Sequence, residues 1–110
     1  MLVGTWEWVG GSGGTGWYSP EIAGYTRTVI FTPDSIYREY RDDSILIYET
    51  PFQVVWGPWF GGEYTYQIAM IHGIRGSTSY TKYTFVYPDS LVLEPLAFDI
   101  GYEIYHRRKQ

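Results

Sequence analysis

Two alternating runs hold the residues of this chain that are best suited to chemistry. They are Glu103, Tyr105 and Arg107 near the C-terminus, and Tyr25, Arg27, Val29 and Phe31 near the N-terminus. Alternate residues of a β-strand share one face, so each run would present its side chains together. A buried arginine needs a carboxylate, which the protein or the head group of a ligand supplies. In one interpretation, Arg27 and Arg107 bind such a group inside the fold. In the other, Arg27 faces water and Arg107 only stacks on Trp6. Arginine is seldom fully buried, which favours the second interpretation.

Catalytic and metal sites have little support in the sequence. The two histidines, His72 and His106, lie on different segments, and no Ser/His/Asp set, close carboxylate pair or metal-ligand spacing stands out. We therefore expect no catalytic residue, no metal and no cofactor. One enzymatic alternative stays open, in which Glu103, Tyr105 and Arg107 serve an isomerase or cyclase reaction.

The bulk composition narrows the class of protein. The chain has 110 residues, no cysteine and a formal net charge of −4. The length predicts one domain over 1–110, and the scattered basic residues argue against a nucleic-acid partner, which requires a clustered basic face. No apolar run approaches the roughly 20 residues of a membrane span. Without cysteines, redox chemistry does not distinguish the cytoplasm from an exported location reached with a signal since removed.

The aromatic content points to strands. Aromatic residues make up 20% of the chain, with 12 Tyr and 5 Trp, and 13 glycines accompany them. Aromatic residues suit strands, glycine suits tight turns, and no segment has an apolar period of 3.6 residues. Strands are predicted at 2–9, 22–32, 36–41, 44–49, 52–56, 63–71, 79–87, 91–96 and 102–108. Because the connections are short, the predicted fold is all-β: a closed, antiparallel up-and-down barrel of about eight strands.

The glycine-rich run 10–16 could be a phosphate-binding loop or a surface loop. A phosphate loop must open a helix and usually has a lysine nearby. The residues that follow, Trp17, Tyr18, Ser19 and Pro20, do not favour a helix, and no lysine is close. We therefore interpret 10–16 as a flexible loop that brings Trp17 and Tyr18 to one mouth of the barrel.

A second connection, at 57–62, is also rich in aromatic residues, with Trp56, Trp59 and Phe60 in or beside it. Aromatic side chains have less packing reason to be on loops than on strands. These side chains line a portal to the interior, contact another subunit, or fold back to cap the barrel as ordinary core.

Several short motifs give the chain a family resemblance. They are Gly4-x-Trp6, the stretches 24–34 and 37–40, and Tyr105-x-Arg107. In combination they resemble the small bacterial lipocalin-like domains of the calycin superfamily. The resemblance implies that Trp6 packs across one end of the barrel and that a last-strand arginine, Arg107 in preference to Arg108, stacks over it. Such a guanidinium–indole contact contributes about 0.5–2 kcal/mol.

The resemblance also implies a function. We expect the protein to bind a small apolar or amphipathic molecule in or at the mouth of the barrel. Fatty-acid-binding members of the superfamily hold a carboxylate with an Arg-x-Tyr pair on the last strand, and Tyr105-x-Arg107 has the reverse order. The expected ligand-binding residues are Trp8, Trp17, Tyr18, Arg27, Phe31, Trp56, Trp59, Tyr105 and Arg107, and the expected structural signature is Gly4, Trp6 and Arg107.

Two other functions without catalysis stay open. The exposed loop aromatics could mediate self-association, as in a homodimer, or docking onto a protein partner. Alternatively, surface Trp and Tyr rings could stack on sugars, which predicts a flat row of exposed rings and a barrel without an internal cavity.

Overall fold

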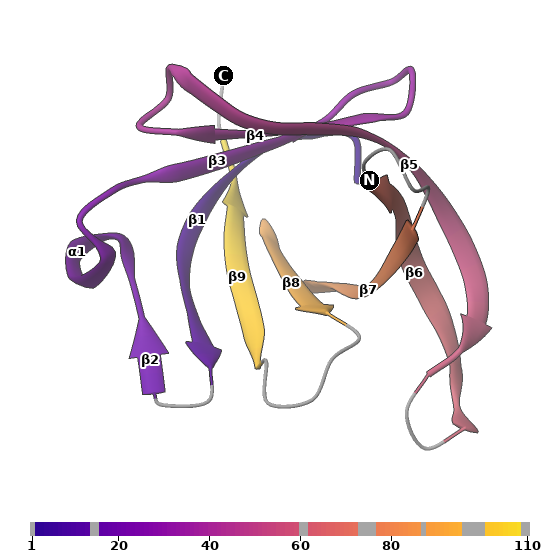
Figure 1. The fold of residues 1–110 in the computed structure, drawn as a ribbon. Helices are drawn as coiled ribbons and strands as arrows, with labels where there is room; N and C mark the ends of the chain where they lie inside the picture. Colours follow the sequence, from indigo (N-terminus) through magenta and orange to yellow (C-terminus); the bar gives the residue numbers. More distant parts are fainter. Residues whose placement is uncertain are drawn as a thin grey trace.

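The computed structural model describes residues 2–13, 16–59, 62–72, 77–86, 88–95 and 101–108. Within these residues there are nine strands and one short helix (Figure 1). In chain order they are β1 (Gly4–Gly13), β2 (Gly16–Tyr18), α1 (Pro20–Ala23), β3 (Arg27–Phe31), β4 (Ile36–Arg41), β5 (Ile45–Pro58), β6 (Tyr64–His72), β7 (Ser77–Val86), β8 (Ser90–Pro95) and β9 (Tyr102–Arg107). The prediction of an all-β chain is confirmed.

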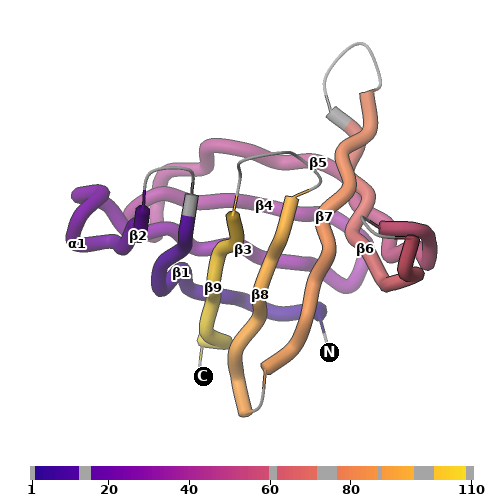
Figure 2. The backbone as a smooth tube through the Cα atoms, turned by 90° about the horizontal axis from the view of Figure 1, so that it is seen from below, coloured from indigo at the N-terminus to yellow at the C-terminus, as the bar shows by residue number. Residues whose placement is uncertain are grey.

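Eight of the strands close into a barrel. The order of hydrogen-bonded neighbours is β2-β1-β3-β4-β5-β6-β7-β8-β9, every pairing is antiparallel, and β9 also pairs with β1. Strand β1 therefore joins β3 through residues 4–7 and β9 through residues 6–12, while its end carries the short strand β2. The predicted up-and-down barrel is confirmed, with β2 as an addition outside the ring of eight. Figure 2 places α1 and β2 on the side opposite the β5–β6 turn.

The core consists of side chains that point into the barrel. The largest fully buried ones are Trp6, Tyr105, Phe31, Ile68, Leu91 and Val29. The ring of Phe31 packs edge-on against Phe52, with centroids 5.1 Å apart, and lies 5.2 Å from Tyr37. Each such side chain contributes about 1.5–3 kcal/mol by leaving water. The barrel is thus packed with side chains around Phe31.

The segment predicted as a strand over 22–32 is in part a helix. Helix α1 begins after Ser19, whose hydroxyl accepts a hydrogen bond from the Ile22 N–H at 3.4 Å, and Pro20 occupies its first turn. It ends at Gly24, which has a φ of 83°. A serine cap, an early proline and a terminal glycine are start and stop signals for a helix, so the expectation that these residues could not start one was wrong.

The run 10–16, expected as a loop, is mostly strand. Strand β1 continues to Gly13 and pairs with β2, with Gly11 opposite Tyr18 and Ser12 opposite Trp17. A Cβ atom at Gly10 would lie 2.4 Å from Cζ2 of Trp17. Glycine is therefore required there because the indole ring packs directly on the backbone of β1. Trp17 and Tyr18 accordingly belong to strand β2.

Two predicted strands, 44–49 and 52–56, are one continuous strand. Strand β5 runs through Pro51, which pairs with Ile36, the first residue of β4. Proline has no N–H to donate and is tolerated where pairing ends. The next N–H, that of Phe52, donates to the carbonyl of Ser35 at 3.0 Å. Trp56 therefore lies on β5, and Trp59 directly follows that strand.

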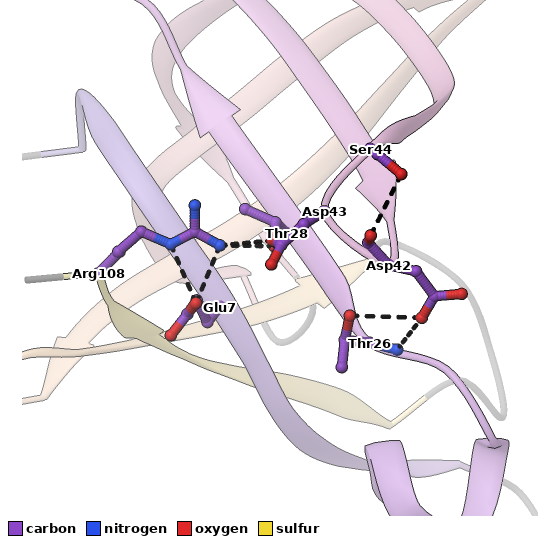
Figure 3. Close-up of polar contacts among 7 residues, drawn as sticks. All are labelled: Glu7, Thr26, Thr28, Asp42, Asp43, Ser44 and Arg108. Carbon is purple, nitrogen blue, oxygen red and sulfur yellow. Dashed lines mark hydrogen bonds and ion pairs between the residues drawn. The ribbon is translucent and has the colours of Figure 1, made fainter.

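Polar side chains on the outer face connect the strands where the barrel closes (Figure 3). They are Glu7, Thr28, Asp43 and Arg108, and we call them the polar clasp. The Arg108 guanidinium contacts Glu7 on β1 at 2.9 Å and Asp43 in the β4–β5 turn at 2.6 Å. Thr28 on β3 donates a hydrogen bond to the same Asp43 oxygen at 3.0 Å. Hydrogen bonds from Arg108 and Thr28 lower the pKa of the Asp43 carboxyl. Arg108 is thus committed to this clasp.

Membrane-spanning helices and clusters of metal-binding side chains are both absent from the part of the chain that the structure describes. No helix in that part of the chain is long and apolar enough to cross a membrane. The same residues contain no group of three or more His, Cys, Asp or Glu side chains that could hold a metal ion.

Candidate ligand-binding site

Two residues of the family-like motif, Trp6 and Arg107, lie side by side where the first and last strands pair. Trp6 on β1 is opposite Arg107 on β9 in the register, and Cζ of Arg107 lies 4.1 Å from the centre of the Trp6 ring. Arg107 also donates a hydrogen bond to the carbonyl of Val3 at 3.1 Å, and the indole nitrogen of Trp6 donates to the carbonyl of Leu2 at 2.9 Å. The resemblance assigned the cover of Trp6 to Arg107 in preference to Arg108, and Arg107 is the arginine found there.

Arg27 points into the barrel, so the favoured expectation that it faces water was wrong. It shares a face of β3 with Val29 and Phe31, both fully buried, and its own side chain is only 16% exposed. Its Nη1 atom lies 2.7 Å from Oε2 of Glu103 and donates to the Tyr105 hydroxyl at 3.3 Å. The carboxylate that a buried arginine requires is therefore supplied by the last strand.

A second carboxylate completes the cluster. The Tyr105 hydroxyl donates to Glu103 at 2.6 Å, and the Tyr37 hydroxyl donates to Oε1 of Glu39 at 2.8 Å. The other oxygen of Glu39 lies 3.9 Å from Nε of Arg27. We call Arg27, Tyr37, Glu39, Glu103 and Tyr105 the interior cluster. It contains one guanidinium and two carboxylates.

Burial and charge together fix the proton positions in the interior cluster. Burial raises the pKa of the Tyr105 hydroxyl well above its ordinary value of 10, and the charge of Glu103 raises it further. Burial likewise raises the pKa of Tyr37. Burial acts to lower the pKa of the Arg27 guanidinium, but its interactions with Tyr105 and Glu103 outweigh that effect and raise it. Both phenols therefore remain protonated donors, and Arg27 remains a cation.

An aromatic stack lies against the cluster. Cζ of Arg27 is 4.5 Å from the centre of the Trp8 ring, and Trp8 stacks on Tyr25 with centroids 6.0 Å apart. Arg41 in turn lies over Tyr25 at 4.0 Å. Among the described residues, the Trp8 indole nitrogen is the one buried side-chain polar atom that has no hydrogen-bond partner.

Two cavities, each of about 230 Å³, meet at the interior cluster. The mouth cavity lies between the ends of β1 and β9, β2 and α1, and its lining includes Trp8, Tyr18, Tyr25 and Tyr102. The barrel cavity is lined from β4 to β9, with Tyr37, Tyr48, Met70 and Leu93 in its wall. Arg27 and Glu103 line both cavities. The barrel therefore retains space beside its polar side chains.

The predicted ligand-binding residues separate into three groups. Trp8, Tyr18, Arg27 and Tyr105 line one or both cavities. Phe31 and Arg107 are structural, since Phe31 is in the core and Arg107 covers Trp6. Trp17, Trp56 and Trp59 line neither cavity; Trp17 packs on Gly10, and Trp56 is 60% exposed at the far end of β5.

The sequence reasoning missed Glu39, Tyr37 and Tyr48 as site residues. A signal for the first two was present, because Tyr37 and Glu39 alternate on β4 and so share a face. Glu103 was noticed as the acidic neighbour of Tyr105 but was not included among the ligand-binding residues.

A separate group of exposed rings lies on the β5–β6 hairpin. Trp56, Tyr64 and Tyr66 are 60%, 60% and 54% exposed. The Trp56 ring centre lies 4.8 Å from that of Tyr66, with the planes at 63°, and 6.2 Å from that of Tyr64, with the planes at 36°. We call these three residues the hairpin aromatic group. Phe60, expected beside them, lies outside the described residues.

Comparison of the chain with protein-family models, with curated proteins and with solved structures finds no match.

Proposed function

We propose that this protein binds a small, largely apolar molecule with one polar end inside the barrel. The observation that carries the proposal is the meeting of two cavities at Arg27 and Glu103. Ligand sites in proteins are concave and mostly apolar, with a few polar groups that orient the ligand. Both cavities have this composition.

The size of the cavities limits the ligand. A volume of about 230 Å³ corresponds to roughly eight water molecules at about 30 Å³ each. This suits a molecule of one or two rings. Apolar contact with rings such as Tyr48 and Trp8 would provide affinity at about 25 cal/mol per Å² buried.

A titration followed by NMR tests the proposal. The indole N–H signals of the chain are recorded while 2-phenylethanol is added, and the expected result is a saturable shift of the Trp8 signal. Thr81 lines the barrel cavity, so Thr81→Phe, which fills it, should weaken binding at least tenfold. Trp56→Ala, on the exposed hairpin, is the matched control and should leave binding unchanged.

Two results would contradict the proposal. One is the absence of any saturable shift with 2-phenylethanol and with charged analogues of the same size. The other is binding that survives Thr81→Phe and disappears in Trp56→Ala, which would move the site to the hairpin.

The hairpin aromatic group favours a second candidate function, self-association or docking onto a protein partner. Three large rings more than half exposed on one hairpin are costly to leave in water and are typical of contact surfaces. Sedimentation at increasing concentration tests it: a dimer that the double variant Trp56→Ser, Tyr64→Ser abolishes would support it, and a monomer at all concentrations would remove self-association.

Sugar binding has less support. The rings of the hairpin aromatic group are inclined to one another by 36° and 63°, so they do not form the flat row that stacking on sugar faces requires. The barrel also contains cavities, which that alternative did not expect.

A further inference from the structure

The barrel cavity carries an excess of negative charge in its wall. Arg27 is the one cationic side chain among its described lining residues, and Glu39 and Glu103 are two anionic ones. The remaining lining is tyrosine, aliphatic side chains and one threonine. The wall therefore bears one net negative charge beside apolar surface.

Arg27, the cation of this wall, already interacts with groups of the protein itself. Arg27 contacts Glu103 at 2.7 Å and Glu39 at 3.9 Å, donates to Tyr105, and lies over Trp8. A ligand carboxylate would be a third anion around one guanidinium. To reach Arg27 closely it would have to displace a protein carboxylate, which would then remain in the barrel without its cation, a costly arrangement.

We propose that the polar end of the ligand is a cation, namely a protonated amine on a small apolar body. This inference rests on the proposed function and specifies its ligand class. One ammonium neutralises the excess charge of Glu39 and Glu103, and both carboxylates accept hydrogen bonds from it. Tyr37 and Tyr48 lie in the same wall with ring centroids 6.3 Å apart, and aromatic rings attract cations.

Three probes of similar size and different charge test the inference. They are 2-phenylethylamine, 2-phenylethanol and 3-phenylpropanoate, each titrated calorimetrically into the full chain at pH 7. The amine should bind at least tenfold more tightly than the carboxylate, with the alcohol between them. Glu39→Gln and Glu103→Gln should each weaken amine binding several-fold and weaken alcohol binding much less.

The control is Glu49→Gln, which removes the same charge from the outer face, where Glu49 pairs with Arg38 at 2.5 Å. It should change none of the three affinities. Carboxylate binding as tight as amine binding would overturn this inference and leave the proposed function standing. If none of the three probes binds, both this inference and the proposed function fail. If a glutamine variant does not fold, the ranking of the three probes with the unaltered chain decides.

Discussion

The guanidinium of Arg107 occupies the space in which a side chain at position 4 would begin. An ideal Cβ atom built on Gly4 would lie 2.5 Å from Nη1 of Arg107, and Gly4 has a φ of 146°. Only glycine combines that backbone conformation with room for the arginine. The Gly4-x-Trp6 motif and the last-strand arginine are therefore one structural unit, although about a hundred residues of chain separate them.

Gly4→Ala should destabilise the protein by about 2–4 kcal/mol. Backbone strain contributes about 1–3 kcal/mol, and displacement of Arg107 from Trp6 removes a contact of about 0.5–2 kcal/mol. Urea unfolding measures the change. In an Arg107→Ala background the cost should be smaller, because the displaced guanidinium is then absent.

Gly62→Ala is the matched control for this cycle. Gly62 also has a positive φ, 84°, but no atom lies within 4 Å of its Cβ position. Its cost should be the same with and without Arg107. Equal costs of Gly4→Ala in both backgrounds would contradict the steric role of Arg107.

Trp6→Phe and Trp8→Phe should differ although both tryptophans are buried. The Trp6 nitrogen donates to the Leu2 carbonyl, whereas the Trp8 nitrogen has no partner among the described residues. Removing a satisfied donor leaves a buried acceptor unpaired, at about 1–3 kcal/mol. Unfolding free energies should therefore show the larger loss for Trp6→Phe, by about that amount. An equal or larger loss for Trp8→Phe would show that its nitrogen makes a stabilising hydrogen bond.

Arg27→Met should cost more stability than the loss of an exposed arginine. It leaves Glu39 and Glu103 without their common cation inside the barrel. We expect about 2 kcal/mol, below the 3–5 kcal/mol typical of a fully buried pair, because Glu103 is partly exposed. Adding Glu103→Gln should restore part of the loss, while Arg38→Met, on the exposed outer face, should cost much less stability than Arg27→Met. No recovery in the double variant would contradict charge as the cause.

Asp43→Asn should reduce stability at neutral pH and have no effect in strong acid. Hydrogen bonds from Arg108 and Thr28 lower the pKa of Asp43 from its ordinary value of 3.8 in the folded state. The stability that this carboxylate contributes is therefore complete above about pH 4 to 5 and is lost as the pH falls through the lowered pKa. Urea unfolding from pH 7 to pH 2 should show the unfolding free energies of the two proteins converging as the pH falls below about 4.

Glu63→Gln is the control, because it removes one exposed carboxylate away from the clasp. At pH 7, Glu63→Gln should lower the free energy of unfolding by less than Asp43→Asn does. If the free energy of unfolding of Asp43→Asn stays as far below that of the unaltered chain at pH 2 as at pH 7, or falls further below it, the predicted pH dependence is wrong.

The residue types and turn signals in the sequence were enough to predict most of the strands. They gave wrong strand bounds where packing between strands determines the local structure. The expected strand ends near Phe31, Arg41 and Arg107 are close to those observed. The run 10–16 was expected as a loop, yet β1 extends to Gly13, and the ring of Trp17 packs on Gly10 and requires it. Separate strands were predicted at 44–49 and 52–56, but the strand runs through Pro51, which lies where pairing with β4 ends, so its missing N–H costs little.

The sequence by itself determined the all-β class, the closure of an antiparallel barrel and the alternation that puts Arg27 and Glu103 on strand faces, because these depend on short-range periodicity and turn chemistry. Only the tertiary structure decided which face is interior, and that Arg27 and Glu103 meet between two cavities with Glu39 beside them. That meeting depends on the register of β3, β4 and β9 around a closed ring. Arg27 and Glu103 are 76 residues apart in the chain, and no local pattern specifies their contact.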